Sequence, residues 1–126
     1  MKTAQDLVML AKQQIHEIGV DEADQCIADA DVLLDVREPS EYEQGHIRGS
    51  VNIPRGLLEF KIGSIPALEP RDTKVVIYCK TSGRSALAAA SLMAMGYMNV
   101  TSIAGGIDDW VASGKSIMTP SMPSFE

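Results

Sequence analysis

Apolar residues recur along this chain in two patterns, one typical of amphipathic helices and the other of buried strands. Near the amino terminus, apolar side chains repeat at helical spacing behind a capping box at residues 3–6, which predicts a helix over residues 4–18. A second amphipathic helix is expected over residues 21–29. The chain therefore begins with two helical segments.

An apolar run without alternation follows at residues 32–36, and such a run is typical of a strand that is covered on both faces. The β-branched residues 75–77 predict a second buried strand, and further strands are expected at residues 51–53 and 100–103. Between them, local composition favours short helices within residues 38–45 and 56–62 and an alanine-rich helix over residues 86–93. Strands that alternate with helices predict an α/β fold with a parallel sheet.

The length of 126 residues fits a single domain that buries a core without disulfides or metal. We expect a helical extension at residues 1–19, the main domain at residues 20–116 and a flexible tail at residues 117–126, where proline and serine are frequent. These boundaries follow from local composition alone.

Charge and cysteine content narrow the possible partners. The chain has 11 basic and 17 acidic residues, a net charge of −6, and no basic cluster, so we expect no nucleic-acid partner. It shows neither a long apolar segment nor a signal-peptide pattern, which predicts a cytoplasmic protein with no membrane contact. The two cysteines do not indicate a disulfide framework, and no Cys/His spacing suggests a metal site.

The segment around Cys79 carries the clearest chemical signal. An apolar strand leads into this cysteine, and a short polar loop then leads into the alanine-rich helix. A loop over a helix amino terminus directs backbone N–H groups and partial positive charge to one point, which favours a thiolate over a thiol. Lys80 and Arg84 add positive charge nearby. We therefore predict that Cys79 is a nucleophile.

The chain resembles the rhodanese-like sulfurtransferases over roughly residues 20–115. The resemblance is carried by several short segments in family order: Leu34-Asp35-Val36-Arg37-Glu38, Gly45-His46-Ile47, Asn52-Ile53-Pro54, Tyr78-Cys79, Ser82-Gly83-Arg84-Ser85 and Gly105-Gly106 before Trp110. It implies one parallel five-stranded sheet with helices on both faces. It also implies that Cys79 carries a transferable sulfur as a persulfide, and we expect no cofactor.

Loop length separates this interpretation from a phosphatase or an arsenate reductase. Four residues lie between Cys79 and Arg84. Related phosphatases and arsenate reductases of the same broad fold have five, which gives a wider loop around a tetrahedral anion. The shorter loop favours one sulfur bonded to the cysteine.

The resemblance implies a sulfur donor such as thiosulfate and a thiophilic acceptor such as cyanide or a thiol. The residues expected to bind the substrate are Lys80, Thr81, Ser82, Gly83, Arg84 and Arg37, largely through backbone N–H groups and positive charge. Asp35 and His46 are expected to support the site structurally.

Three roles stay open at this stage. Arg84 either contacts the ligand or braces the loop through an acidic neighbour, and Lys80 either binds the ligand or is solvated. Cys26 is either a core residue of its helix or a resolving thiol. A further alternative is a sulfur-carrying or sensing module that docks a protein partner through its amino-terminal helix. In the simpler interpretation, that helix packs on its own domain.

Overall fold

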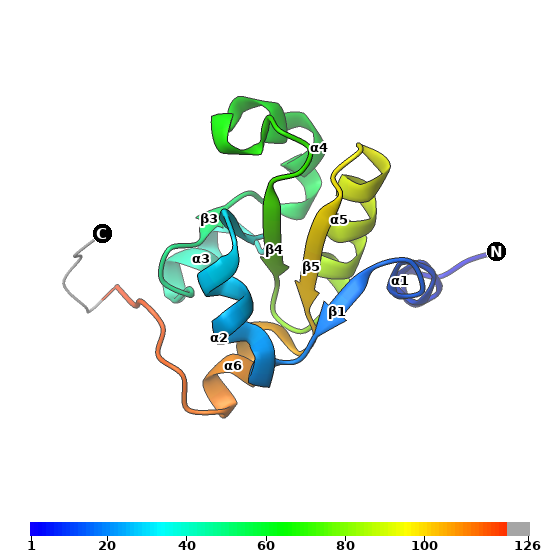
Figure 1. Ribbon diagram of the computed structural model, residues 1–126. Helices are drawn as coiled ribbons and strands as arrows, with labels where there is room; N and C mark the ends of the chain where they lie inside the picture. Colours follow the sequence, from blue (N-terminus) through cyan, green and yellow to red (C-terminus); the bar gives the residue numbers. More distant parts are fainter. Residues whose placement is uncertain (121–126) are drawn as a thin grey trace.

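A central five-stranded parallel sheet organises the chain in the computed structural model, which describes residues 1–120 (Figure 1). The spatial order of the strands is β1-β5-β4-β2-β3, and every pair is parallel. Their bounds are β1 (His16–Ile18), β2 (Val32–Asp35), β3 (Val51–Asn52), β4 (Lys74–Tyr78) and β5 (Asn99–Ile103). The predicted α/β fold is confirmed.

Helices cover both faces of this sheet (Figure 1). The core on one face lies under α4 and α5, and the core on the other lies under α2 and α6. The helices are α1 (Ala4–Lys12), α2 (Val20–Asp29), α3 (Pro39–Gln44), α4 (Leu58–Lys61), α5 (Gly83–Ala94) and α6 (Gly106–Ala112). Three 3₁₀ turns flank α4: Arg55–Leu57, Ile62–Ser64 and Pro66–Leu68.

The prediction of one helix over residues 4–18 is wrong at its carboxyl-terminal end. Helix α1 ends at Lys12, and residues 16–18 form strand β1, which pairs with β5 in the register His16↔Thr101. Extended backbone here satisfies the otherwise open hydrogen-bonding edge of β5, whereas a helix would leave that edge unpaired. The fifth strand of the sheet therefore comes from the segment expected to be helical.

Helix α1 packs against α5, as expected if it covers its own domain. A Cβ added at Gly83, the first residue of α5, would lie 3.6 Å from Cγ2 of Val8. Leu7 and Met9 nevertheless keep 48% and 52% of their surface exposed. No helix of the described residues has the length and apolar character needed to cross a bilayer.

Residues at the start of the predicted tail are packed on the domain. Met118 is buried and pairs with His46 in an isolated antiparallel bridge. The part of the predicted tail from residue 121 onward lies outside the described residues. The domain boundaries at residues 19 and 116 stay predictions.

Candidate active site

Cys79 lies immediately after β4, at the carboxyl-terminal edge of the sheet, and only 1% of its surface is exposed. Its Sγ accepts a hydrogen bond from the Ser85 backbone N–H at 3.4 Å and lies 3.5 Å from the Ser85 Oγ. Ser85 belongs to the first turn of α5. The strand and the following helix thus hold the sulfur from two sides.

The segment at the start of α6 supports the cysteine loop through its backbone. The N–H of Ile107 donates to the carbonyl of Cys79 at 3.0 Å, and the N–H of Asp108 donates to the carbonyl of Lys80 at 3.1 Å. Gly106 has φ +58°, and a Cβ on it would collide with the carbonyl oxygens of residues 79–81, two of them at 2.6 Å. Three successive carbonyls of the loop therefore face α6 at close range.

This carbonyl arrangement fixes the direction of the intervening N–H groups. The described part of the chain contains no cis peptide bond, and a trans peptide holds each C=O opposite to the following N–H. Since the carbonyls of residues 79–81 face α6, the N–H groups of residues 80–82 are directed away from it. Successive N–H groups with a common direction form an anion-binding concavity.

Arg84 is engaged by a carboxylate from α3. Its two terminal nitrogens contact the two carboxylate oxygens of Glu41 at 2.6 and 3.1 Å, a bidentate pair whose side chains are about one-third exposed. The hydrogen bonds from Arg84 lower the pKa of Glu41 to about 2, and the same contact raises the pKa of Arg84. This contact between the loop and α3 favours the bracing alternative for Arg84, which stays a proposal.

Lys80 and Arg37 are also paired with carboxylates. Lys80 Nζ lies 2.7 Å from Oδ2 of Asp108, and both side chains are about half exposed. Arg37 is buried and contacts the fully buried Asp35 at 2.7 Å, and it donates to the Gly45 carbonyl at 2.7 Å. Burial opposes the charge of Arg37, but the Asp35 carboxylate prevails and raises the pKa of Arg37.

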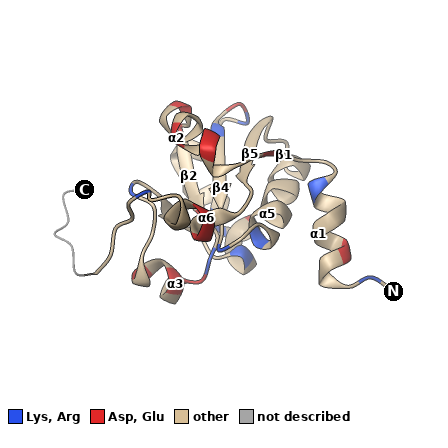
Figure 2. Ribbon diagram, turned by 90° about the horizontal axis from the view of Figure 1, so that it is seen from below, with Lys and Arg blue, Asp and Glu red and all other residues tan. Residues whose placement is uncertain are grey.

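Each cation proposed from the sequence thus has an anionic partner, and acidic positions of α3 and α6 lie next to the basic start of α5 (Figure 2). Such pairs cancel most of the side-chain charge near the cysteine. Attraction of an anion therefore depends chiefly on the backbone N–H groups and on the α5 amino terminus.

His46 lies in the segment after α3 and contacts other parts of the scaffold. Its ring stacks on Tyr42 with centroids 3.8 Å apart, and its Nδ1 lies 3.1 Å from the Tyr42 carbonyl oxygen. Its backbone pairs with Met118. These contacts favour the structural role expected for His46, which stays a proposal.

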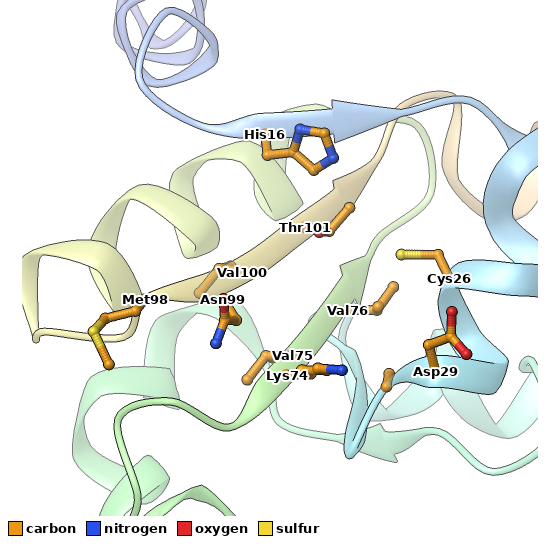
Figure 3. Close-up of a pocket in the computed structure, with 11 residues that line it drawn as sticks. His16, Cys26, Asp29, Lys74, Val75, Val76, Met98, Asn99, Val100 and Thr101 are labelled. Atoms are coloured by element: carbon orange, nitrogen blue, oxygen red, sulfur yellow. The ribbon is translucent and has the colours of Figure 1, made fainter.

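Cys26 lies at the opposite edge of the sheet, in a cavity of about 370 Å³ near the amino-terminal ends of β1, β4 and β5 (Figure 3). Partial burial and the carboxylates of Asp29 and Glu22 raise the pKa of this thiol, against a hydrogen bond with Thr101. Cys26 packs on the α2 side of the sheet, whereas Cys79 belongs to the core on the α5 side. A direct disulfide between them is excluded by this placement.

Sequence reasoning did not predict the contact of Ser85 with Cys79, and it missed Ser102 as part of the site. Ser102 on β5 is fully buried, and its hydroxyl donates to the Ser85 hydroxyl at 2.9 Å. The available signal for Ser102 was a serine at an interior position of a predicted strand, where an unpaired hydroxyl is costly. No group of three or more His, Cys, Asp or Glu among residues 1–120 could hold a metal ion.

Comparison with known proteins agrees with this geometry. The model of the Rhodanese-like domain family matches residues 19–113, so the chain belongs to that family. A sulfurtransferase of Allochromatium vinosum is 36% identical over 108 residues, which cover 84% of this chain and 97% of that protein. The thiosulfate sulfurtransferase PspE of Escherichia coli is 38% identical over 80 residues, covering 64% of this chain and 74% of PspE.

A solved structure from Rhodopseudomonas palustris is similar over nearly the whole chain. Its TM-score is 0.84 at 33% identity, and the match covers 94% of this chain and 96% of that one. That protein is described as of unknown function and a possible tyrosine phosphatase. Together, the family match and the sulfurtransferase relatives place this chain among the rhodanese-like sulfurtransferases.

Proposed function

We propose that this protein is a sulfurtransferase that carries a sulfane sulfur as a persulfide on Cys79. The observation that carries the proposal is the set of N–H groups of residues 80–82, all directed away from α6 in the loop that follows the buried cysteine. Fixed donors of this kind stabilise negative charge without reorganising during a reaction. The family membership supports sulfur as the group transferred.

The reaction consists of two displacements at sulfur. The Cys79 thiolate attacks the outer sulfur of thiosulfate, a new S–S bond forms, and the old S–S bond breaks with sulfite as the leaving group. An acceptor thiolate or cyanide then attacks the outer sulfur of the persulfide and releases the Cys79 thiolate. Neither step removes a proton, so the site needs anion stabilisation more than a general base.

Backbone and side-chain groups of the loop have different proposed roles in this reaction. The backbone N–H groups of residues 80–84 hold the anionic sulfur, with the hydroxyls of Thr81 and Ser82 as further donors. Arg84 fixes the loop against α3 through Glu41, at contacts of 2.6 and 3.1 Å. Lys80 is exposed and is free to reorient from Asp108 toward an incoming anion. Buried Arg37 supports the loop between β2 and α3 with Asp35.

Thiosulfate is the donor we propose first, because the relative PspE is named a thiosulfate sulfurtransferase. A thiol is the acceptor proposed beside cyanide. Sulfur delivery to a protein partner is the second candidate, favoured by the exposed Leu7 and Met9 of α1, the helix whose Val8 approaches Gly83 at the start of α5. Ready sulfur loading with slow turnover on cyanide would favour that second function.

Phosphatase activity is not favoured, although one structural relative is described as a possible tyrosine phosphatase. Four residues separate Cys79 from Arg84, one fewer than the related phosphatases have. In addition, Glu41 occupies the guanidinium fork of Arg84 that would otherwise face an oxyanion.

Intact-protein mass spectrometry after incubation with thiosulfate tests the proposal. We expect one added sulfur atom on the wild type and on Cys26→Ser, and none on Cys79→Ser. Release of the sulfur by cyanide should restore the original mass. An unmodified wild type, or an adduct that persists in Cys79→Ser, would refute the persulfide role. Hydrolysis of p-nitrophenyl phosphate that depends on Cys79 would instead favour a phosphatase.

A further inference from the structure

A chain of buried hydroxyls leads from the middle of the sheet to the reactive sulfur. Ser102 on β5 donates to the Ser85 Oγ at 2.9 Å, and the Ser85 Oγ lies 3.5 Å from the Cys79 Sγ. Both serines have no exposed surface. Ser102 therefore reaches the cysteine through one intervening hydroxyl.

The Ser85 hydroxyl has one proton and two possible acceptors for it. Its oxygen lies 3.2 Å from the Ser82 carbonyl oxygen and 3.5 Å from the Cys79 Sγ. When Cys79 is a thiol, its S–H donates to the Ser85 oxygen, and Ser85 in turn donates to Ser82. When the sulfur is an anion, the Ser85 proton is free to turn toward it.

Ser102 limits the ways in which Ser85 can respond. By donating to the Ser85 oxygen, it occupies one lone pair in both states and fixes the position of that oxygen 2.9 Å away. A hydroxyl that accepts a hydrogen bond is also a stronger donor, because hydrogen bonds in a chain polarise one another. The Ser102 hydroxyl thus strengthens the donation from Ser85 to an anionic sulfur.

We propose that Ser102 is a positioning residue for sulfur transfer, which orients the Ser85 hydroxyl toward the anionic sulfur of Cys79. This inference rests on the proposed role of Cys79 as the sulfur-carrying nucleophile. Ser102 does not touch the substrate and acts only through Ser85.

The test measures the rate of Cys79 alkylation by iodoacetamide as a function of pH, a readout that requires no sulfur donor. In Ser102→Ala the midpoint of this profile should move upward by about half a pH unit, because the anionic sulfur loses part of its hydrogen bonding. The kcat for thiosulfate should fall about threefold to tenfold with little change in KM. Thr73→Val is the matched control, because Thr73 is a buried hydroxyl at the opposite edge, and its profile should not move.

A double-variant cycle distinguishes action through Ser85 from a general loss of packing. If Ser102 acts through Ser85, adding Ser102→Ala to Ser85→Ala should produce no further shift of the profile. Ser102→Thr and Ser102→Val share one shape and differ in the hydroxyl, so only the valine variant should show the shift. If Ser102→Ala does not fold, the comparison of the threonine and valine variants tests the inference instead.

An unchanged profile in Ser102→Ala or Ser102→Val, or an additive shift in the double variant, would overturn the inference. A different result would refute the proposed function itself. In that case thiosulfate adds no sulfur to the wild type, while the alkylation profiles still report whether Ser102 positions the hydroxyl beside Cys79.

Discussion

The two cysteines lie at opposite edges of one sheet, in surroundings of opposite character. At the carboxyl-terminal edge, Cys79 is buried and contacts the N–H and hydroxyl of Ser85. At the amino-terminal edge, Cys26 borders a cavity of about 370 Å³ lined by both apolar and polar side chains, and the carboxylate of Asp29 lies nearby (Figure 3). Hydrogen-bond donors beside Cys79 favour an anionic sulfur, whereas burial and nearby carboxylates raise the pKa of the Cys26 thiol despite its hydrogen bond with Thr101.

This difference shows that cavity size alone does not indicate which cysteine lies beside groups that favour an anion. The cavity beside Cys26 has the dimensions of a small-molecule site, yet burial and negative charge raise the pKa of its thiol. The Cys79 loop needs little volume, because one sulfur atom bonded to the cysteine is small. What distinguishes the two edges is the direction of backbone dipoles, which converge at the carboxyl-terminal edge of a parallel sheet.

The largest loss of activity is expected from Gly106→Ala, because its added Cβ prevents the close approach between α6 and the cysteine loop. The added Cβ would collide with the carbonyl oxygens of residues 79–81, so the loop has to move and its N–H groups lose their common direction. We expect the rate of sulfur loading from thiosulfate to fall about 100-fold, as measured by intact-protein mass spectrometry of samples quenched at successive times.

Gly114→Ala is the matched control for this substitution. Gly114 also has a positive φ, +87°, but a Cβ there would meet nothing within 4 Å. Its backbone strain should lower the free energy of unfolding by about 1 kcal/mol without slowing sulfur loading. Equal loss of activity in both variants would show that strain, and not the contact with the loop, causes the defect.

The next effect sharpens the contrast between the two thiols. At pH 7.5, iodoacetamide should modify Cys26 more slowly than Cys79, because burial and nearby carboxylates raise the pKa of the Cys26 thiol and leave less of it as thiolate. Peptide mapping over time measures both rates in one sample. Comparable rates at the two cysteines would contradict the distinction between the edges.

The smallest effect concerns the ion pair that fixes the cysteine loop to α3. The pKa of Glu41 is lowered from its ordinary value of 4.5 to about 2. The ionised carboxylate therefore stabilises the fold fully above pH 4.5, and this stabilisation is lost as the pH falls from 4.5 to 2. Glu41→Gln should therefore lower the free energy of unfolding by about 1 kcal/mol at pH 7 and flatten its dependence on acid pH.

Asp108→Asn is the control for this prediction, because its pair with Lys80 is more exposed and more strongly screened by solvent. Urea unfolding at several pH values measures both variants. Parallel acid profiles for the wild type and Glu41→Gln would show that the Arg84 contact does not contribute to stability.

Much of the fold could be predicted from the sequence, because β2 and β4 are apolar on both faces and α5 is rich in alanine. Strand β1 could not be predicted, since residues 15 and 18 also fit the apolar face of a helix. Only the unpaired edge of β5 selects the extended conformation of residues 16–18.

The candidate site could likewise be predicted from the sequence only in part. Cys79 and its loop could be predicted, because a strand, a polar loop and a helix follow one another within a few residues. The pairing of Arg84 with Glu41 joins positions 43 residues apart, and that of Ser102 with Ser85 joins positions 17 apart. Such contacts depend on how helices and strands pack, which local pattern does not specify.

The sequence by itself thus determined the α/β class, the short loop and the position of the cysteine that we propose as the nucleophile, because these depend on neighbouring residues and on segment periodicity. The tertiary structure decided which carboxylate neutralises each cation near Cys79 and where the fifth strand pairs. It also decided that Gly106 directs the loop N–H groups and that Ser102 reaches the sulfur through Ser85. The physical reason is that these interactions form only when segments distant in the chain meet at one edge of the sheet.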